Sequence, residues 1–326
     1  MGPDKTHATI MNIPIIDISP FFDKDSAGKQ EVTKKVGYAC EKIGFMIIVG
    51  HGVSESLVSR TSVVAQNFFA LSHEEKLKVH MPGKGRGYLP LETESLASSK
   101  FGKATPGDLK ESFNIGANHA QNRWPDRPKH MRSIWTDYFH AMMGLSTHII
   151  RIFAVALGLP ERFFDKMTDN PKAVLRATNY PPLQKVPGPE QFRAGPHTDY
   201  GTLTIISTNP ETGLQVYTRS GQWIDVEPPS NSFIVNIGDL MMRWTNDKWI
   251  STLHRVITPS LEQTGKRRQS LVFFHNPNPC ALIKCLDCCC SPENPPKYLP
   301  VLAEEYLKEK SRRSLNKDLS VIKGCQ

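Results

Sequence analysis

Hydrophobic residues recur at two different spacings along the chain, and the spacing changes near residue 174. Before that point apolar side chains return every three to four positions over long stretches, which is typical of one buried face of a helix. The longest stretch, 131–157, stops at a Gly-Leu-Pro sequence that ends helices. Two short apolar runs, 13–18 and 45–49, predict strands. The predicted helices are 29–43, 54–70 and 131–157, with a short helix behind the capping box Ser72-x-x-Glu75.

After residue 174 the apolar runs are short and rich in β-branched residues, and turn residues separate them. Such spacing is typical of an antiparallel sandwich or barrel. The segments 81–87 and 91–109 show no clear period and are predicted as loops, and 304–313 is predicted as a closing helix. The predicted strands are 174–180, 203–208, 214–218, 223–226, 232–237, 254–257 and 270–276.

These elements predict an α+β chain with a mainly β core and helices outside one sheet. We expect one integrated unit rather than separable domains. Its parts are an N-terminal tail over 1–12, a mixed helical region over 13–165, the β core over 166–280 and a C-terminal segment with the closing helix over 281–326.

Composition narrows the function classes. A hydrophobic share of 39% supports a sizeable core, and the formal net charge is +8. The basic residues are scattered and not interleaved with aromatics, so we expect no nucleic-acid partner, although a positive field can attract small anions. The chain shows no apolar run of about 18 residues and no apolar stretch behind its first basic residues, so we expect no membrane segment and a cytoplasmic location. Nothing predicts an obligate protein partner.

Cysteine usage argues against a disulfide framework. The number of cysteines is odd, and four of them gather within six positions. Cys285-x-x-Cys288 has zinc-like spacing, but no second Cys or His pair follows at a suitable distance. We therefore expect reduced thiols and no zinc. The cysteines are Cys40, Cys280, Cys285, Cys288, Cys289, Cys290 and Cys325.

Three residues carry the candidate chemistry. His197 and Asp199 are two positions apart, and on an extended segment such positions face the same side. His254 follows 55 positions after Asp199 (254 minus 199), enough chain for antiparallel strands to return a third ligand. Two His and one carboxylate on one face form the ligand set of non-haem Fe(II) oxygenases, which leaves coordination sites open.

A basic partner and two rival imidazoles complete the candidate set. Arg268 and Ser270 alternate onto one face of a predicted strand, where a guanidinium and a hydroxyl can bind a carboxylate. His51 lies in a Gly-His-Gly turn, and His275, five positions past Ser270, faces the other side of its strand. We expect both of these histidines to be structural.

With these residues in place, the chain resembles the isopenicillin N synthase-like branch of the Fe(II)/2-oxoglutarate dioxygenases along nearly its whole length. The resemblance is specific because many separate motifs match in order. The matching stretches are 13–21, 44–45, 51–53, 68–76, 179–182, 197–199, 235–239, 245–246, 251–256 and Arg268-x-Ser270.

The resemblance implies a fold and a ligand set. The fold is a double-stranded β-helix, a cupin-like jelly roll flanked by helices, with the metal at its mouth. In such proteins the residues matching His197, Asp199 and His254 bind Fe(II). Those matching Arg268 and Ser270 bind the distal carboxylate of 2-oxoglutarate, with help from the residue matching Tyr180. O2 is the second cosubstrate, and ascorbate is a candidate reductant.

The implied activity is oxidation of a small metabolite in specialised-metabolite biosynthesis. It is hydroxylation, desaturation or oxidative ring closure, with succinate and CO2 released. Arg243 favours an anionic, carboxylate-bearing substrate, unless it forms a surface salt bridge. Two alternatives stay open, namely an oxidase of the same fold that uses no 2-oxoglutarate and a non-catalytic binding protein. The candidate substrate contacts are Tyr88, Phe113, Gln215, Tyr217, Arg243 and Phe274.

Overall fold

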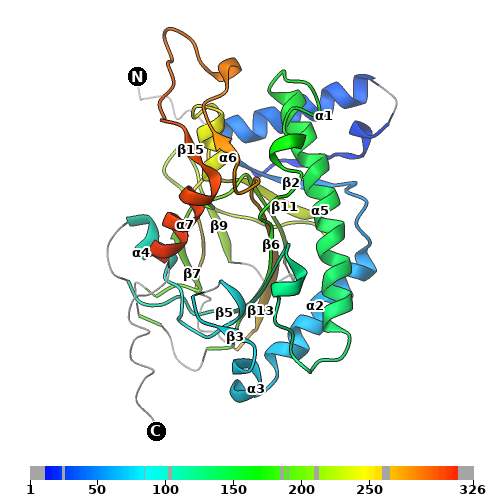
Figure 1. Cartoon of the computed structure of the whole chain (residues 1–326), viewed down its shortest axis with the longest axis vertical. Helices are drawn as coiled ribbons and strands as arrows, with labels where there is room; N and C mark the ends of the chain where they lie inside the picture. Colours follow the sequence, from blue (N-terminus) through cyan, green and yellow to red (C-terminus); the bar gives the residue numbers. More distant parts are fainter. Residues whose placement is uncertain are drawn as a thin grey trace, which may run out of the picture.

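The computed structural model describes residues 12–23, 26–83, 85–101, 105–183, 187–188, 191–208, 213–258 and 265–314. Within these residues a larger sheet has nine strands in the order β1-β2-β11-β8-β13-β6-β5-β4-β3, and a smaller sheet has four in the order β10-β9-β12-β7 (Figure 1). The larger sheet joins strands of the first and second halves of the chain, because β2 pairs with β11 and β5 pairs with β6.

The strands of the two sheets are β1 Ile15–Asp17, β2 Phe45–Val49, β3 His80–Met81, β4 Arg86–Leu89, β5 Glu111–Gly116, β6 Val174–Tyr180, β7 Ala194–His197, β8 Leu203–Thr208, β9 Leu214–Tyr217, β10 Trp223–Asp225, β11 Phe233–Ile237, β12 His254–Val256 and β13 Arg268–His275. A further hairpin pairs β14 Leu282–Ile283 with β15 Val301–Leu302. The α-helices are α1 Ser26–Lys42, α2 Glu55–Phe69, α3 His73–Leu77, α4 Leu96–Phe101, α5 Met131–Ala156, α6 Asp239–Trp244 and α7 Ala303–Ser314.

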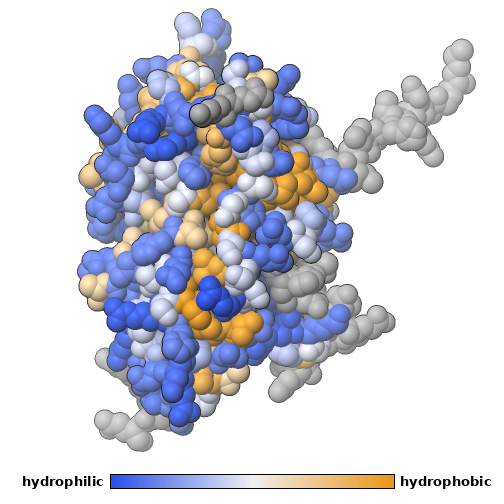
Figure 2. All heavy atoms as spheres, turned by 90° about the vertical axis from the view of Figure 1, so that its right-hand side faces the viewer, coloured by the Kyte–Doolittle hydropathy of each residue, from blue (hydrophilic) through white to orange (hydrophobic). Residues whose placement is uncertain are grey.

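Helices α1, α2 and α5 cover one face of the larger sheet (Figure 1). Their buried faces share one apolar cluster with the sheet, in which Trp135 and Phe153 of α5 join Phe113 and Leu271. Among the described residues α5 is also the one helix long and apolar enough to cross a membrane, but half of its most apolar 18-residue window is buried, as in a core helix. Viewed from this side, apolar patches (orange) lie among hydrophilic surface (blue) (Figure 2).

The smaller sheet faces the other side of the larger one across a second apolar cluster. Phe45 and Ile234 of the larger sheet meet Val216 and Val256 of the smaller sheet there. Neighbouring residues along each strand point to opposite faces, so β13 contributes Leu271 to the helix side and its alternate positions to the space between the sheets. This two-sheet core with outer helices confirms the predicted α+β jelly roll.

Strand register separates the two ends of the β core. His197 pairs with His254 in the smaller sheet. Strand β8 begins just after Asp199, and its antiparallel partner β13 begins beside the far end of β8, where Ser270 pairs with Thr208. Arg268 pairs with Tyr180 at that same far end. The predicted metal ligands and the predicted carboxylate-binding residues therefore belong to opposite ends of the β8–β13 strand pair.

Several elements were not predicted from the sequence, among them β7 and α6, and the segment 81–87, predicted as a loop, includes the start of β4. The segment 91–109, predicted as a loop, contains α4. Strand β5 was not predicted, although Phe113 and Ile115 alternate with Ser112 and Asn114, because all six of its residues are buried and only two of them are apolar. Elsewhere β2, β6 and β8 agree with their predicted bounds, and α5 ends one residue earlier than expected.

Candidate active site

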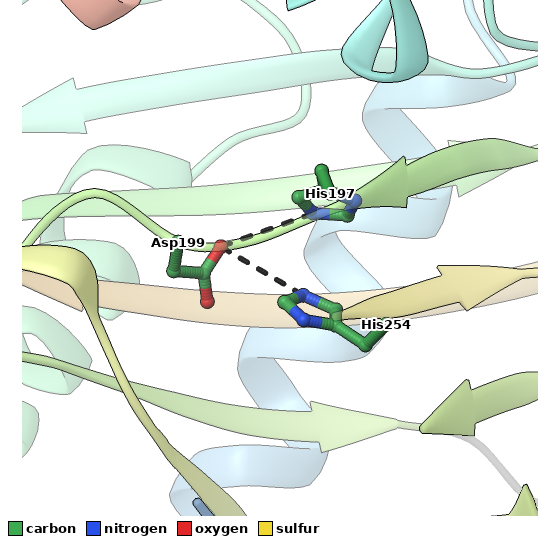
Figure 3. Close-up of side chains that lie close together, drawn as sticks. All are labelled: His197, Asp199 and His254. Carbon is green, nitrogen blue, oxygen red and sulfur yellow. Dashed lines mark ion pairs between the residues drawn. The ribbon is translucent and has the colours of Figure 1, made fainter. Parts of the chain in front are cut away.

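Three side chains meet at the end of the smaller sheet (Figure 3). His197 is the last residue of β7, Asp199 lies in the turn that follows, and His254 is the first residue of β12. The Nε2 atoms of both imidazoles lie 3.8 Å from Oδ1 of Asp199. One ligand atom of each residue lies within 4.8 Å of the other two. The structure thus brings together the triad that the sequence predicted.

Backbone carbonyls orient both imidazoles. Nδ1 of His197 lies 2.7 Å from the Gly195 oxygen, and Nδ1 of His254 lies 3.0 Å from the Thr252 oxygen. A carbonyl oxygen only accepts, so each Nδ1 carries the proton that it donates, and in the neutral form of either ring Nε2 is the atom that offers a lone pair. Burial and the neighbouring His254 lower the pKa of His197 to about 3, so this imidazole is neutral at physiological pH. Neutral imidazoles held in this way are metal ligands.

One oxygen of the Asp199 carboxylate accepts a hydrogen bond, and the other faces the two imidazoles. Asn236 donates to Oδ2 at 2.7 Å, which leaves Oδ1 facing both Nε2 atoms. Burial alone would raise the pKa of Asp199, but the two imidazoles, Thr204 and Asn236 hold it below its ordinary value. Asn236 lies within the recognised stretch 235–239, but its contact with the triad was not foreseen from the sequence.

This donor set fits Fe(II). Two imidazole nitrogens and one carboxylate oxygen form the ligand set of non-haem Fe(II) oxygenases, which would leave coordination positions for small ligands. In the part of the chain that the structure describes, no other group of three His, Cys, Asp or Glu comes as close together.

The two rival imidazoles are structural, as predicted. His51 accepts from the Val53 amide at 3.1 Å and lies 3.1 Å from the Asn231 oxygen, so it fixes a turn. His275 is buried, and its Nδ1 lies 2.9 Å from the Thr202 hydroxyl.

The cysteine segment gives no support to a zinc site. Cys288 and Cys289 have sulfur atoms 3.8 Å apart, and Cys285 lies 3.6 Å from Oδ1 of Asn246. Burial raises the pKa of Cys289 to about 12, so that thiol stays protonated. The six cysteines within the described residues are free thiols, and Cys325 lies outside those residues.

Arg268 is a buried cation between the sheets. It is 2% exposed, and its Nε and Nη1 atoms have no hydrogen-bond partner. Its guanidinium lies 5.0 Å from the centre of the Tyr180 ring, and Ser270 follows on the same face of β13. Burial lowers the pKa of Arg268, and Tyr180 works against that shift. Free N–H groups on a buried guanidinium fit a planar carboxylate.

The six candidate substrate contacts do not share one surface. Phe274 is half-buried and lies on the face of β13 that carries Arg268 and Ser270. Tyr88 and Phe113 instead belong to the cluster on the helix side of the larger sheet. Both pack against Phe68 there, at ring-centre distances of 6.0 and 4.9 Å.

Gln215, Tyr217 and Arg243 also lie away from the triad. In the pairing of β9 with β12, Val216 is the residue opposite His254, so Gln215 and Tyr217 face outward. Gln215 accepts from the Arg255 guanidinium at 2.8 Å, and Tyr217 is 39% exposed. Arg243 donates to the Leu299 oxygen at 2.9 Å and so ties down the C-terminal segment. These contacts give no support to a role in substrate binding, which stays a prediction for all three residues.

A buried ionic network that the sequence did not reveal lies next to the triad. Arg176 donates two hydrogen bonds to Glu94, at 2.9 and 3.0 Å. Lys110 lies 3.4 Å from Glu94 and 3.0 Å from Asp108. Burial would raise the pKa of Glu94, but Arg176 and Lys110 lower it to about 2.

Asp108 links this network to the metal site. It accepts from the Gly195 amide at 2.9 Å, and the Gly195 carbonyl holds His197. Asp108 and Glu94 belong to the segment predicted as an unpatterned loop, so no periodic signal marked them.

Comparison with known families gives two matches. Residues 13–138 match the family described as non-haem dioxygenase in morphine synthesis N-terminal. Residues 171–277 match the 2OG-Fe(II) oxygenase superfamily, and this range contains all three triad residues.

Several characterised proteins are similar over most of the chain. The 2-oxoglutarate-Fe(II) type oxidoreductase hxnY of Emericella nidulans is 35% identical over 322 residues, covering 92% of this chain and 90% of hxnY. The Arabidopsis thaliana homoarginine-6-hydroxylase 2-ODD-C23.1 is 34% identical over 304 residues, covering 85% and 88%. The crystal structure of Neurospora crassa T7H with alpha-KG and thymine is 31% identical, with a TM-score of 0.83 and coverage of 91% and 96%.

Proposed function

Because this chain belongs to the 2OG-Fe(II) oxygenase superfamily, we propose that it oxidises a small, carboxylate-bearing metabolite by hydroxylation, desaturation or ring closure. The enzyme class, an Fe(II)- and 2-oxoglutarate-dependent oxygenase, follows from the family and the triad. The finer proposal takes support from relatives whose names or bound ligands are small molecules, homoarginine and thymine. We place the reaction in specialised-metabolite biosynthesis.

The convergence of the three ligand atoms carries the proposal. His197, Asp199 and His254 would hold Fe(II), and the carbonyl bonds to Nδ1 keep both imidazoles oriented before metal binds. Bound Fe(II), with 2-oxoglutarate and O2, supplies the oxidising power to remove hydrogen from a substrate C–H bond as succinate and CO2 form. Burial of the triad limits access of bulk water to this point.

Arg268 would bind the distal carboxylate of 2-oxoglutarate. Its unpaired N–H groups lie between the sheets, and an anion there would remove the cost of an uncompensated buried charge. Ser270, on the same face, would add a hydroxyl donor, and Tyr180 would hold the guanidinium from its other side. This arrangement favours a 2-oxo acid over the same-fold oxidase that uses none.

An exposed cation beside the triad supports an anionic substrate. Nζ of Lys100 lies 3.4 Å from the hydroxyl of Thr198, the residue between the first two metal ligands. A positive side chain at this position would attract a carboxylate to the mouth of the site. Arg243, the original reason for expecting an anionic substrate, binds the C-terminal segment instead.

The test is anaerobic reconstitution with Fe(II), followed by exposure to O2 and measurement of succinate with and without candidate amino acids and carboxylate metabolites. Substrate-dependent succinate formation is the expected result. Oxidation of a metabolite without 2-oxoglutarate would replace this function with the oxidase alternative. Absence of metal binding would leave only the binding-protein alternative.

We also propose a reductant and a cellular location for the enzyme. Ascorbate would serve as a reductant that returns the metal to Fe(II), which its effect on total turnover would test. A cytoplasmic location is supported by the free thiols of the described residues, since reducing compartments keep thiols unpaired.

A further inference from the structure

The turn that carries Asp199 is bonded to the first residues of α6. The Asp239 amide donates to the Asp199 carbonyl at 2.8 Å, and the Gly238 amide donates to the Thr202 carbonyl at 3.0 Å. The backbones are so close that a Cβ on Gly238 would lie 2.3 Å from the Gly201 oxygen. These contacts hold the turn that carries Asp199 against the start of α6.

The side chain of Asp239 is in turn held by α7. Its Oδ2 accepts from Nζ of Lys310 at 2.8 Å and from the Tyr306 hydroxyl at 3.0 Å. The carboxylate is 4% exposed, so these two donors replace water that it lacks. Lys310 also lies 5.6 Å from the centre of the Tyr200 ring, next to Asp199. In Figure 1 α7 lies on the side of the molecule opposite α5.

We infer that Asp239 is a positioning residue for the metal ligand Asp199, and that α7 sets its position through Lys310 and Tyr306. The C-terminal helix then influences metal binding, although it contributes no ligand. This inference rests on the proposed function, because it requires the triad to hold a divalent cation. Partners of this kind, one step removed from a metal ligand, commonly change metal affinity by about 10–100-fold.

The same helix offers a matched control. Lys308 is two positions from Lys310, but its Nζ pairs with Glu304 at 3.1 Å and its side chain is 66% exposed. Replacing Lys308 by Met removes the same charge from α7 as replacing Lys310 by Met, but it leaves the hydrogen bonds of Asp239 in place. Tyr306→Phe provides an almost isosteric change that deletes one hydrogen bond to Asp239.

The experiment titrates the full-length, metal-free protein with Mn(II) alone and records the dissociation constant and the thermal midpoint of each variant. Lys310→Met should weaken Mn(II) binding by about 10-fold or more, and Tyr306→Phe by a smaller factor of about 3. Lys310→Arg should restore most of the affinity, and Lys308→Met should stay within about 2-fold of wild type.

The outcomes separate the inference from the function on which it rests. Wild-type Mn(II) affinity in both Lys310→Met and Tyr306→Phe overturns the inference, even if their thermal midpoints fall, because α7 would then be structural only. If Lys310→Met does not fold, the affinity of Tyr306→Phe decides in the same way. If the wild-type protein itself binds no Mn(II), the proposed metal site fails first.

Discussion

The neighbouring strands β5, β6 and β13 carry buried polar groups on both faces of the larger sheet, and the hydrogen bonding of these groups differs between the two faces. On the helix side, Glu111 accepts from Lys76 at 2.7 Å, from Tyr88 at 2.6 Å and from Asn179 at 2.8 Å. On the side between the sheets, Arg268 keeps two nitrogen atoms without partners.

This difference indicates that Glu111 is a structural buried charge, and it supports the proposal that Arg268 binds a ligand. A buried ion pair whose partners all come from the chain contributes to a specific packing and has nothing left to bind. A buried guanidinium with unpaired donors destabilises the free protein and gains its partner only when a ligand arrives. Substitutions on the helix side should therefore lower the free energy of unfolding, and substitutions between the sheets should weaken ligand binding.

The largest effect is expected at the triad. Asp199→Ala should abolish metal uptake and turnover in chloride-free buffer, because two neutral imidazoles hold a dication weakly. Metal analysis and succinate measurement check this, with the thermal midpoint of the metal-free protein as a control for folding. Full activity in this variant would refute the ligand assignment.

On the helix side, Glu111→Gln should leave Lys76 as an uncompensated buried cation. The free energy of unfolding should fall by about 3–5 kcal/mol, measured by urea denaturation. The KM for 2-oxoglutarate, measured where the variant is folded, should not change. Glu31→Gln, which breaks the exposed pair with Lys35, is the matched control and should leave stability unchanged. A large rise in the KM for 2-oxoglutarate with an unchanged free energy of unfolding would show that the two faces do not differ in this way.

Between the sheets, Arg268→Lys should raise the KM for 2-oxoglutarate by roughly 10- to 150-fold, the equivalent of a charge-assisted interaction of about 1.5–3 kcal/mol. Lys cannot reproduce the two-pronged geometry of a guanidinium. The neighbouring Arg267→Lys should change this KM little. If Arg268→Lys weakens only the prime substrate, the arginine binds that substrate and the oxidase alternative gains support.

The Glu94 network is an intermediate case, since it is paired within the chain but lies beside the triad. The pKa of Glu94 falls from an ordinary 4.5 to about 2, so its ionised form is favoured in the folded state. Its contribution, on the order of 3 kcal/mol, is present above pH 4.5 and lost as the pH falls toward 2. The stability difference between wild type and Glu94→Gln, from urea curves, should therefore shrink across that range. A constant difference would mean that Glu94 titrates normally.

The smallest effect is expected in the cysteine segment, which belongs to neither face. Replacing Cys288, Cys289 and Cys290 by Ser should leave the metal content at about one iron and activity near wild type, because no partner pair for zinc is present among the described residues. Stoichiometric zinc that disappears in this variant would contradict the prediction.

His197 and Asp199 were predicted from local information, whereas His254 was predicted because the stretch around it, 251–256, matches the family. An i, i+2 pair on an extended segment shares a face whatever the rest of the chain does, and Arg268 and Ser270 follow the same rule. The strands after residue 174 were predicted for the same reason, since short β-branched runs between turn residues are a local signal.

The features that could not be predicted from the sequence depend on pairing between distant segments. Gln215 faces outward because Val216, not Gln215, pairs with His254, and a shift of one residue would reverse this. Glu94 and Asp108 act through Arg176 and Gly195, which are 82 and 87 positions away in the chain. Nothing in the local pattern around either carboxylate marks such a partner.

The separation of the metal ligands and Arg268 onto different sheets has a consequence for the lifetime of the enzyme. A cosubstrate held as proposed, through the metal at one end and by Arg268 at the other, would join the smaller sheet to the larger one. A ligand that binds only the folded state stabilises it more as the ligand concentration rises. Slower amide hydrogen exchange in both sheets, and slower proteolysis, should accompany 2-oxoglutarate binding. The supply of a central metabolite would then regulate how long each molecule survives as well as how fast it works.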